Sequence, residues 1–451
     1  MFRRILVANR GEVAARIIRA CRELGIESVA VHSAADTDSP HLRLADERIC
    51  IGPSPSSESY LDMDAILQAA EQTECQAVHP GFGFLGENAH FAARVRRQLL
   101  TWIGPPPNAI ARMGDKAEAR RAMKAAGLPT IPGTEGILAD VEQARRAAAE
   151  VGYPVLLKAT AGGGGKGMRM CGDESELARA YNQASLEAEK AFGNAGLYLE
   201  KVLVGARHIE FQVLADVFGH AIHLGERECS VQRRHQKLLE EAPSPVMTSA
   251  VRGEVGPRAA DAAAAIGYTS AGTMEFLRDG DGKHYFMEMN TRLQVEHPVT
   301  EMITGIDIVS EQIKIAANRP LEISQDEVHI DGHAIEFRIN AEDPDRDFRP
   351  DPGRITVFEP PVGDGIRVDT HVEAGYQIPP FYDSMIAKLI VHGADRDDAI
   401  RKSSEALDAF RIEGVRTTIP IHRRILAEPV FRDGSYDTSW LESKLLARLE
   451  G

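Results

Sequence analysis

Residues 273–290 read TMEFLRDGDGKHYFMEMN, and this stretch decides how the chain is expected to fold around a functional site. Two runs of alternating polar and apolar residues flank the turn sequence DGDG, a pattern that is typical of a β-hairpin. Antiparallel pairing of the two runs places Glu275 opposite Glu288, and carboxylates about 5 Å apart across a ladder repel each other. A divalent cation removes this repulsion, and oxygen ligands suit Mg²⁺ or Mn²⁺. The hairpin therefore predicts a metal site at Glu275 and Glu288, with Asn290 on the same face.

The polar alternation continues beyond the hairpin. Every second side chain is polar and most residues between them are apolar, and the polar set is Glu288, Asn290, Arg292, Gln294 and Glu296. Two other predicted strands, 208–213 and 335–340, show the same period of two. We interpret this face as the floor of a site and not as a solvent-exposed sheet, because a solvated face would rarely oppose two glutamates and omit lysine.

The segment ERECSVQRRHQK, residues 226–237, is unusually dense in charge. Charged side chains are mostly found at the protein surface, where water solvates them. On its composition alone, this segment is therefore predicted to be a solvated loop.

A glycine-rich segment at residues 162–167 separates two predicted strands, 153–159 and 168–170. Its glycines match the spacing G-x-G-x-x-G, but the segment joins two strands and opens no helix, which excludes a dinucleotide fingerprint. It also lacks the first glycine and the Ser or Thr of a P-loop. Consecutive glycines let main-chain N–H groups approach an oxyanion closely. We therefore expect a mobile lid over phosphates, with Lys158 before the loop and Lys166 inside it.

The first hundred residues alternate between short apolar strands and helices. Strands are expected at 5–8, 28–32 and 76–79, and a helix at 12–24 ends at Gly25. This alternation predicts a parallel, doubly wound sheet. The first strand-to-helix turn carries one glycine where a dinucleotide fingerprint has three, which excludes a nicotinamide or flavin site there.

Length and composition exclude several classes of protein. The 451 residues suggest about three domains. The net charge of −15 excludes a sequence-independent nucleic-acid binder, which needs a basic footprint. No stretch approaches the roughly 20 apolar residues of a membrane span, and the five widely spaced cysteines suit reduced thiols, so we expect a cytoplasmic protein. An anionic substrate would need a local basic cluster. Candidates for that cluster are Lys116, Lys158, Lys166, Lys237, Arg292 and Arg338.

Together these residues indicate an enzyme that binds a magnesium nucleotide without a Walker loop or a kinase loop. The chain also resembles the biotin carboxylase family, the ATP-grasp component of biotin-dependent carboxylases. The resemblance covers nearly the whole length and is carried by motifs at residues 8–12, 79–88, 113–116, 162–169, 226–237, 286–298 and 338–343.

The resemblance implies a combined α/β and α+β fold in three domains. A Rossmann-like domain would occupy residues 1–114, and an ATP-grasp domain residues 115–330, with a mobile lid at about 131–203. A mixed C-terminal domain would occupy residues 331–451.

The resemblance also implies roles for individual residues. The nucleotide-binding set would be Lys116, Lys158, Gly164, Gly165, Lys166, Glu200, Lys201, Leu203, His208, Gln232, His235, Glu275 and Glu288. Bicarbonate and biotin would be bound by Lys237, Arg292, Gln294, Val295, Glu296, Arg338 and Phe82. Within this second set the catalytic residues would be Lys237, Arg292, Glu296 as general base and Arg338 as the group that stabilises enolised biotin. The Mg²⁺ or Mn²⁺ ligands would be Glu275 and Glu288, with Asn290 beside them.

The implied activity is ATP-dependent carboxylation of biotin by bicarbonate, with biotin attached to a biotin carboxyl carrier protein. This is the first half-reaction of an acetyl-CoA or other acyl-CoA carboxylase in fatty acid biosynthesis, which implies carboxyltransferase partners. Arg19 and Glu23 match a homodimer contact of the family. Two alternatives stay open: another ATP-grasp ligase, of the carboxylate–amine or carbamoyl-phosphate synthetase type, and a catalytically inactive regulatory subunit.

Overall fold

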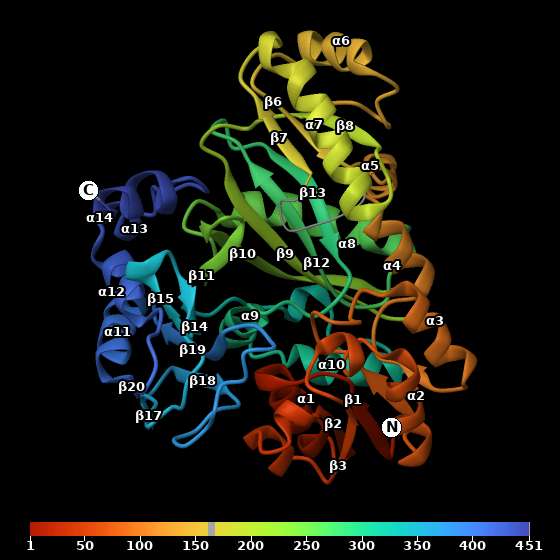
Figure 1. The fold of residues 1–451 in the computed structure, drawn as a ribbon, viewed down its shortest axis with the longest axis vertical. Coiled ribbons are helices and arrows are strands. Elements are labelled where there is room, and N and C mark those ends of the chain that lie inside the picture. Colours follow the sequence, from red (N-terminus) through yellow and green to blue (C-terminus); the bar gives the residue numbers. More distant parts are fainter. Residues whose placement is uncertain (161–166, 451) are drawn as a thin grey trace.

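The computed structural model describes residues 1–160 and 167–450 and has a mixed α/β architecture (Figure 1). In Figure 1 a parallel sheet with its helices lies at the bottom, in red and orange. A long antiparallel sheet extends from the centre, in green, toward the left, in cyan and blue. A small three-stranded sheet with two helices lies at the top, and the C-terminal helices lie at the left in blue. The mixed fold class expected from the sequence is confirmed.

The N-terminal sheet is parallel and has the strand order β3-β2-β1-β4-β5. Its strands are β1 (Arg4–Val7), β2 (Glu27–Ser33), β3 (Glu47–Gly52), β4 (Ala77–His79) and β5 (Thr101–Trp102). The helices of this part are α1 (Gly11–Glu23), α2 (Met63–Gln72), α3 (Ala89–Arg97) and α4 (Pro107–Gly114). Alternate residues of β1 enter two different apolar cores, since Ile5 and Val7 pack in one and Leu6 in the other. The doubly wound parallel sheet predicted from the sequence is therefore confirmed.

An eight-stranded antiparallel sheet forms the centre of the molecule, with the order β13-β12-β9-β10-β11-β14-β19-β18. Its strands are β9 (Arg207–Ala215), β10 (Ala221–Arg233), β11 (Gln236–Ala242), β12 (Ser270–Arg278), β13 (His284–Asn290), β14 (His333–Asn340), β18 (Ile366–Thr370) and β19 (Met385–Gly393). The predicted hairpin is formed by β12 and β13, and its register places Glu275 opposite Glu288 as expected. The pairing of β11 with β14 carries the sheet across residue 330 without interruption.

The three-stranded sheet at the top of Figure 1 has the order β7-β6-β8. It consists of β6 (Val155–Ala159), β7 (Met168–Cys171) and β8 (Leu197–Lys201), with α6 (Val141–Val151) and α7 (Glu174–Phe192) packed on it. Leu157 and Leu199 belong to an apolar core that is confined to this part. β6 and β7 confirm the strands predicted on either side of the glycine segment, of which residues 161–166 lie outside the described chain.

The remaining elements cover the central sheet or extend it toward the C-terminus. α8 packs against β9 and β10, and α11 packs against β14 and β19. The helices are α5 (Lys116–Ala125), α8 (Ser249–Ala265), α9 (His297–Thr304), α10 (Ile308–Ala316), α11 (Arg396–Ala409), α12 (Ile419–Ala427), α13 (Pro429–Arg432) and α14 (Ala447–Glu450). The short strands are β15 (Glu342–Asp343), β16 (Arg349–Pro350), β17 (Val357–Glu359) and β20 (Arg411–Glu413).

Helix α1 joins the parallel sheet to the central sheet through buried ion pairs. Glu12 Oε2 lies 3.3 Å from the Nζ of Lys388 on β19, and both side chains are buried. One turn further along, Arg16 donates to Glu301 of α9 over 2.9 Å. Charged pairs, as well as apolar packing, therefore hold these two parts together.

The expectation of a solvated loop at residues 226–237 is wrong. Most of this segment lies in β10, at the centre of the sheet, and residues 226–232 are buried, whereas 234–236 are exposed at the turn into β11. Its charges are compensated by partners from other elements: Arg227 pairs with Glu210 over 2.5 Å, and Glu226 pairs with Arg252 over 2.6 Å. Ion pairing inside the protein replaces solvation, which the local composition could not indicate.

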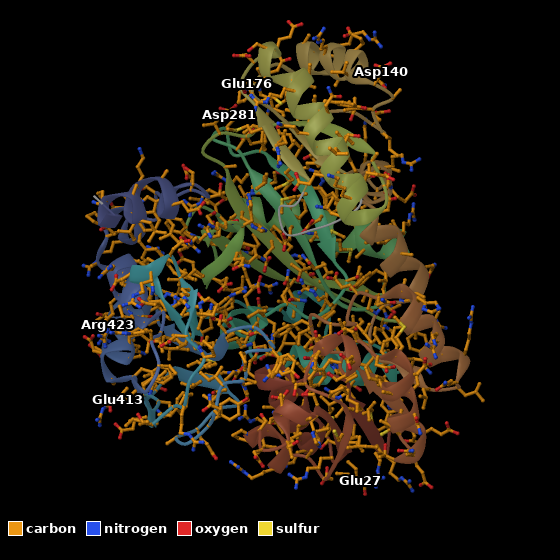
Figure 2. All side chains as sticks on the ribbon, viewed as in Figure 1. Glu27, Asp140, Glu176, Asp281, Glu413 and Arg423 are labelled. Carbon is orange, nitrogen blue, oxygen red and sulfur yellow. The ribbon has the colours of Figure 1, made fainter. Side chains whose placement is uncertain are left out.

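Many other charged residues lie at the surface. Figure 2 labels several of them, including Asp281 at the tip of the β12–β13 hairpin and Asp140 at the start of α6, and both are exposed. Within residues 1–160 and 167–450, no helix combines the length and apolar character that crossing a bilayer requires.

Two phenylalanines on one hairpin test the central core. Phe211 of β9 is fully buried, whereas Phe218, in the turn before β10, is 58% exposed. Phe211→Ala should lower the free energy of unfolding by about 3–5 kcal/mol because it removes a buried ring and leaves a cavity. Phe218→Ala should change it by less than about 0.5 kcal/mol. Scanning calorimetry of both variants measures the difference, and equal thermal midpoints would contradict this packing.

Candidate active site

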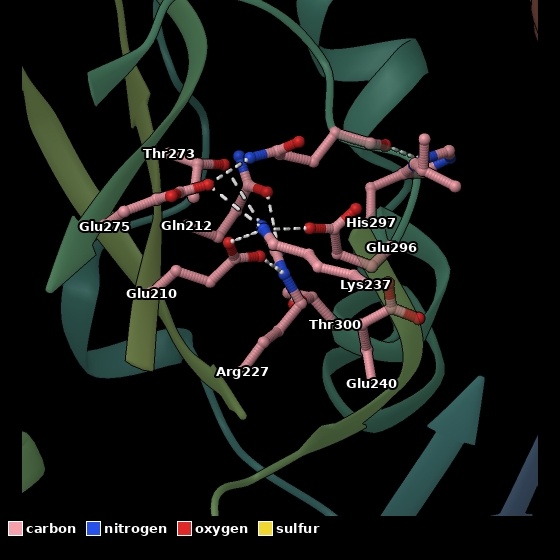
Figure 3. Close-up of polar contacts among 12 residues, drawn as sticks. Glu210, Gln212, Arg227, Lys237, Glu240, Thr273, Glu275, Glu296, His297 and Thr300 are labelled. Atoms are coloured by element: carbon pink, nitrogen blue, oxygen red, sulfur yellow. Dashed lines mark hydrogen bonds and ion pairs between the residues drawn. The ribbon is translucent and has the colours of Figure 1, made fainter. Parts of the chain in front are cut away.

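The ammonium group of Lys237 lies between three carboxylates at the start of β11 (Figure 3). Its Nζ is 2.6 Å from Glu210 Oε2, 3.0 Å from Glu275 Oε1 and 2.5 Å from Glu296 Oε1. Burial alone would lower the pKa of Lys237, but Cys229 and the three carboxylates raise it well above its ordinary value. Lys237 is therefore a fixed cation at the centre of an acidic cluster.

The register of the sheet brings these carboxylates together. Glu275 lies opposite Glu288 on one side and opposite Glu210 on the other, and Glu210 lies opposite Arg227. Four charged residues thus form one row across β13, β12, β9 and β10. Lys237 lies against the middle of this row and supplies the positive charge that facing carboxylates need.

Arg227 supports the row from a fully buried position in β10. Its guanidinium donates to Glu210, to Gln212 Oε1 over 2.8 Å, and to the hydroxyls of Thr273 and Thr300 over 3.1 and 3.0 Å. Figure 3 shows it beneath Lys237, pointing into the same cluster. The sequence analysis missed this residue. The signal that could have found it was Glu210, a polar residue on a predicted inner strand that requires a cation nearby.

Glu296 is held between two cations, since Oε1 contacts Lys237 and Oε2 accepts a hydrogen bond from Arg338 over 3.0 Å. Burial would raise the pKa of Glu296, but Lys237, Arg338 and Arg227 hold it well below its ordinary value. The Arg338 guanidinium also donates through Nε to Glu240 Oε1 over 2.7 Å, and its Nη2 lies against the same Glu240 oxygen. Glu240 is a second residue of this cluster that the sequence analysis did not select.

β13 ends at Asn290, as expected from the sequence, but the polar alternation that continues to residue 296 lies in an irregular turn and not on one extended face. The side chains of the turn still converge, because Arg292 donates to Asn290 Oδ1 over 3.0 Å and to Gln294 Oε1 over 2.8 Å. The amides of Asn290 and Gln294 in turn donate to Glu275 over 2.7 and 3.0 Å. Hydrogen bonds between side chains, and not strand alternation, therefore bring this set together.

Two distant residues hold the turn from outside. Glu87, which precedes α3, accepts from Arg292 Nε over 2.9 Å and from the backbone N–H of Thr291 over 2.9 Å. Lys388 of β19 donates to the carbonyl oxygen of Val295 over 2.8 Å. The parallel sheet and the C-terminal part of the central sheet thus both fix the turn.

The nucleotide-binding set expected from the sequence is only partly brought together. Glu200 is buried between Lys158, at 2.5 Å, and Arg120, at 3.0 Å. The ammonium of Lys201 instead donates to the carbonyl oxygens of Gly152 and Tyr153, so its side chain is tied to the small top sheet. Gly164, Gly165 and Lys166 lie outside the described residues.

The remaining expected residues lie around this region. Lys116 at the start of α5 is 3.6 Å from Glu288, and Gln232 Nε2 is 3.4 Å from His208 Nδ1. His235 lies in the β10–β11 turn with a left-handed φ of 62°. The half-buried Leu203 follows β8.

Phe82 lines a cavity of about 360 Å³ together with Phe84 and Tyr382. This cavity lies between the end of the parallel sheet and the segment before β19. Neither Lys237 nor Arg338 lines this cavity.

The donor set at the hairpin fits a divalent cation. Glu275, Glu288 and Asn290 offer hard oxygen atoms on adjacent strands, and the Glu288 side chain is 38% exposed. Oxygen and nitrogen atoms of His208, Glu210 and Glu275 also lie within 4.8 Å of one another, but Lys237 already contacts both of those carboxylates. A metal ion would therefore bind at Glu288, with Glu275 as a second ligand.

The comparisons with known proteins agree along the whole chain. The family model for the biotin carboxylase N-terminal domain matches residues 1–110, and the model for the biotin carboxylase C-terminal domain matches residues 336–443. Between them, residues 115–324 match the ATP-binding domain of the carbamoyl-phosphate synthase L chain.

Named relatives match over nearly their full lengths. The chain is 53% identical to biotin carboxylase 1 of Bacillus subtilis over 98% of this chain and 99% of that protein. The solved biotin carboxylase domain dimer of Hydrogenobacter thermophilus 2-oxoglutarate carboxylase, in complex with MgADP, ADP and bicarbonate, has a TM-score of 0.94 and 51% identity. That match covers 98% of this chain and 97% of the solved chain. The biotin carboxylase–β-γ-ATP complex of Campylobacter jejuni has a TM-score of 0.95 and 48% identity, with 98% of each chain covered.

The arrangement of the site and these similarities lead to the same result. A β-hairpin with facing glutamates, a lysine shared by three carboxylates and a separate small sheet above them occur in a chain whose relatives match it from end to end. The ATP-grasp and Rossmann-like parts expected from the sequence are confirmed by the same matches. The chain belongs to the biotin carboxylase family.

Proposed function

We propose that the chain carboxylates biotin with bicarbonate in an ATP-dependent reaction that passes through carboxyphosphate. The position of Glu296 carries this proposal, because its two carboxylate oxygens lie against Lys237 and Arg338 beside the acidic hairpin. A base held between two cations suits a reaction in which an anionic substrate must be bound and deprotonated at one place. Solved relatives with MgADP and bicarbonate support the same reading.

The turn after β13 would bind bicarbonate. Arg292, Gln294 and the backbone N–H of Val295 belong to this turn, and Lys237 lies beside it. An anion that draws Lys237 toward itself weakens the ion pair of that lysine with Glu296, and Glu296 becomes a stronger base. The bicarbonate proton then passes to Glu296, and the resulting oxyanion attacks the γ-phosphate of ATP with release of ADP.

Biotin would react in the second stage. Carboxyphosphate breaks down to CO₂ and phosphate, phosphate removes the proton from biotin N1, and N1 attacks CO₂. Arg338 would stabilise the enolised ureido oxygen, since its guanidinium is fixed by Glu240 and Glu296. Phe82, at the edge of its aromatic cavity, would lie against biotin.

The hairpin glutamates Glu275 and Glu288, with Asn290 beside them, would hold Mg²⁺ or Mn²⁺. When bound, the ion would neutralise charge on the β- and γ-phosphates of ATP. Two lysines near Glu288 and Glu200 would add to this positive field, namely Lys116 and Lys158. The remaining nucleotide contacts are proposed at Gly164, Gly165, Lys166, Glu200, Lys201, Leu203, His208, Gln232 and His235.

We also propose a division into a domain at 1–114, an ATP-grasp domain at 115–330 with a lid at about 131–203, and a C-terminal domain at 331–451. The separate core of the three-stranded sheet supports treating it as a lid. A homodimer is proposed from the dimeric relative. The expected partners are a biotin carboxyl carrier protein and a carboxyltransferase, and the five cysteines, all free, support a cytoplasmic location.

A second candidate is another ATP-grasp ligase. It is favoured by one observation, the match of residues 115–324 to the ATP-binding domain of the carbamoyl-phosphate synthase L chain. Such an enzyme would share the ATP and bicarbonate steps but would not use biotin. The two candidates therefore differ in the acceptor of the carboxyl group.

We expect ATP cleavage by the purified chain to require bicarbonate and to increase when free biotin is added. The physical reason is that carboxyphosphate persists in a closed site until an acceptor removes its CO₂. Coupled measurement of ADP release, with and without each substrate, checks this. Turnover that needs bicarbonate but ignores biotin would instead support the second candidate.

The metal site predicts a large effect of a small change. Glu288→Gln should lower kcat by about a hundredfold or more, because an amide neutralises one of the two proposed carboxylate ligands of the metal. Asp281→Asn makes the same chemical change at the exposed tip of the same hairpin and should leave kcat within about twofold of its original value. Steady-state kinetics over a range of Mg²⁺ concentrations, with thermal midpoints for both variants, separates loss of activity from loss of folding. If the two variants behave alike, the hairpin does not hold the metal.

A further inference from the structure

Two neighbouring glutamates on β11 are both fully buried but have very different surroundings. Glu240 and Glu241 are adjacent, so their side chains point to opposite faces of the central sheet. Glu241 is bound by Arg396 and His333, whereas Glu240 accepts a hydrogen bond from Arg338. Figure 3 shows Glu240 below Lys237 and Glu296. β11 therefore contains both a candidate functional residue, Glu240, and a control residue, Glu241.

Glu241 is fully paired. It accepts hydrogen bonds from Arg396 Nε over 2.7 Å, from the Tyr436 hydroxyl and from His333 Nε2 over 2.6 Å. Burial would raise the pKa of Glu241, but His333 and Arg396 lower it to about 2. Its role is structural, because it joins β11 to β14, α11 and the C-terminal segment.

Glu240 is only half paired. Arg338 binds its Oε1 atom, while Oε2 is buried with no hydrogen-bond partner among the described residues. Arg338 is itself shared, because it also donates to Glu296 Oε2. One guanidinium thus binds two carboxylates, so a closer interaction with one weakens its interaction with the other.

Several charged groups face Glu240. Glu336 lies directly opposite on β14, Glu296 approaches from the turn before α9, and Lys237 comes from the start of β11 itself. Beyond Glu336 lies the buried Lys388 of β19. Burial raises the pKa of Glu240 to about 7, with Arg338 opposing the shift and Glu296 adding to it.

We propose that Glu240 is a positioning residue that divides Arg338 between two carboxylates and so keeps Glu296 able to accept the bicarbonate proton. Ionised Glu240 pulls Arg338 away from Glu296, which leaves Glu296 the stronger base. Neutral Glu240 releases Arg338 to Glu296, which weakens that base. The inference rests on the proposed function, and it adds a control of base strength outside the bicarbonate and metal sets.

The sign of the pH effect follows from this arrangement. As pH rises through the range where Glu240 ionises, the original enzyme gains base strength at Glu296. In the Glu240→Gln variant, the side chain at position 240 is neutral at every pH but keeps an oxygen that can accept a hydrogen bond from Arg338. Glu296 in this variant therefore stays the weaker base at every pH. A change of one unit in the pKa of Glu296 corresponds to about tenfold in rate when proton transfer controls it.

The experiment measures biotin-stimulated ATP cleavage at saturating bicarbonate from pH 6 to pH 8.5 for both enzymes. The ratio of kcat values, original to variant, should rise from about one at pH 6 to about tenfold at pH 8.5, with the KM for ATP unchanged. Taking the ratio cancels the pH dependence of bicarbonate supply. A ratio that is flat across this range would overturn the inference, even if the variant is uniformly slower.

Two further variants complete the test. Glu240→Asp keeps an ionisable carboxyl with a shorter reach, so its ratio should also rise with pH but by less, and a flat ratio would again count against the proposal if Glu240→Gln does not fold. Glu241→Gln should lower the thermal midpoint and leave the pH profile unchanged; an equal change of profile would show that the effect is not specific to Glu240. If the original enzyme shows no stimulation by biotin, the proposed function itself fails, and this inference fails with it.

Discussion

The ammonium of Lys237 is the interaction on which the site depends. It compensates carboxylates that arrive from three different segments, at Glu210, Glu275 and Glu296, and all three are buried. Without a cation at this position, the facing glutamates of β9 and β12 would repel one another in a medium where charges interact strongly. The antiparallel register creates the acidic row, and Lys237 compensates the repulsion between the carboxylates that this register places side by side.

Besides Lys237, three arginines supply positive charge to this region, and each binds a different carboxylate. Arg227 lies beneath the row and supports Glu210, whereas Arg338 lies beside it and faces Glu296. The turn after β13 then adds Arg292, which Glu87 holds from the N-terminal part. The groups proposed to meet substrate come from inner strands of the central sheet, such as Lys237 and Arg338, and from the turn after β13, such as Arg292.

Much of this could be predicted from the sequence where the information is local. The hairpin register followed from the alternation around Glu275 and Glu288 and from the turn between them, so it was predicted correctly. The buried position of residues 226–232 was not predicted, because the partners of that segment lie elsewhere in the chain and its own composition resembles a surface loop. For the same reason the sequence around Lys201 gave no sign that its ammonium donates to the carbonyl oxygens of Gly152 and Tyr153. Local sequence patterns do not show which side chains from distant segments pair with each other.

The buried ion pairs of α1 have a consequence for how this chain can be altered. Glu12 meets Lys388, and Arg16 meets Glu301, across the boundary between the parallel sheet and the rest of the molecule. Removing Glu12 or Lys388 leaves the other as a lone buried charge, which costs several kcal/mol. Arg16 and Glu301 each keep a second partner, since Arg16 also pairs with Asp307 and Glu301 with Arg367. A chimera that joins the N-terminal segment of one relative to the body of another must therefore inherit both halves of each pair, and the N-terminal segment expressed alone would expose charges that evolved to be covered.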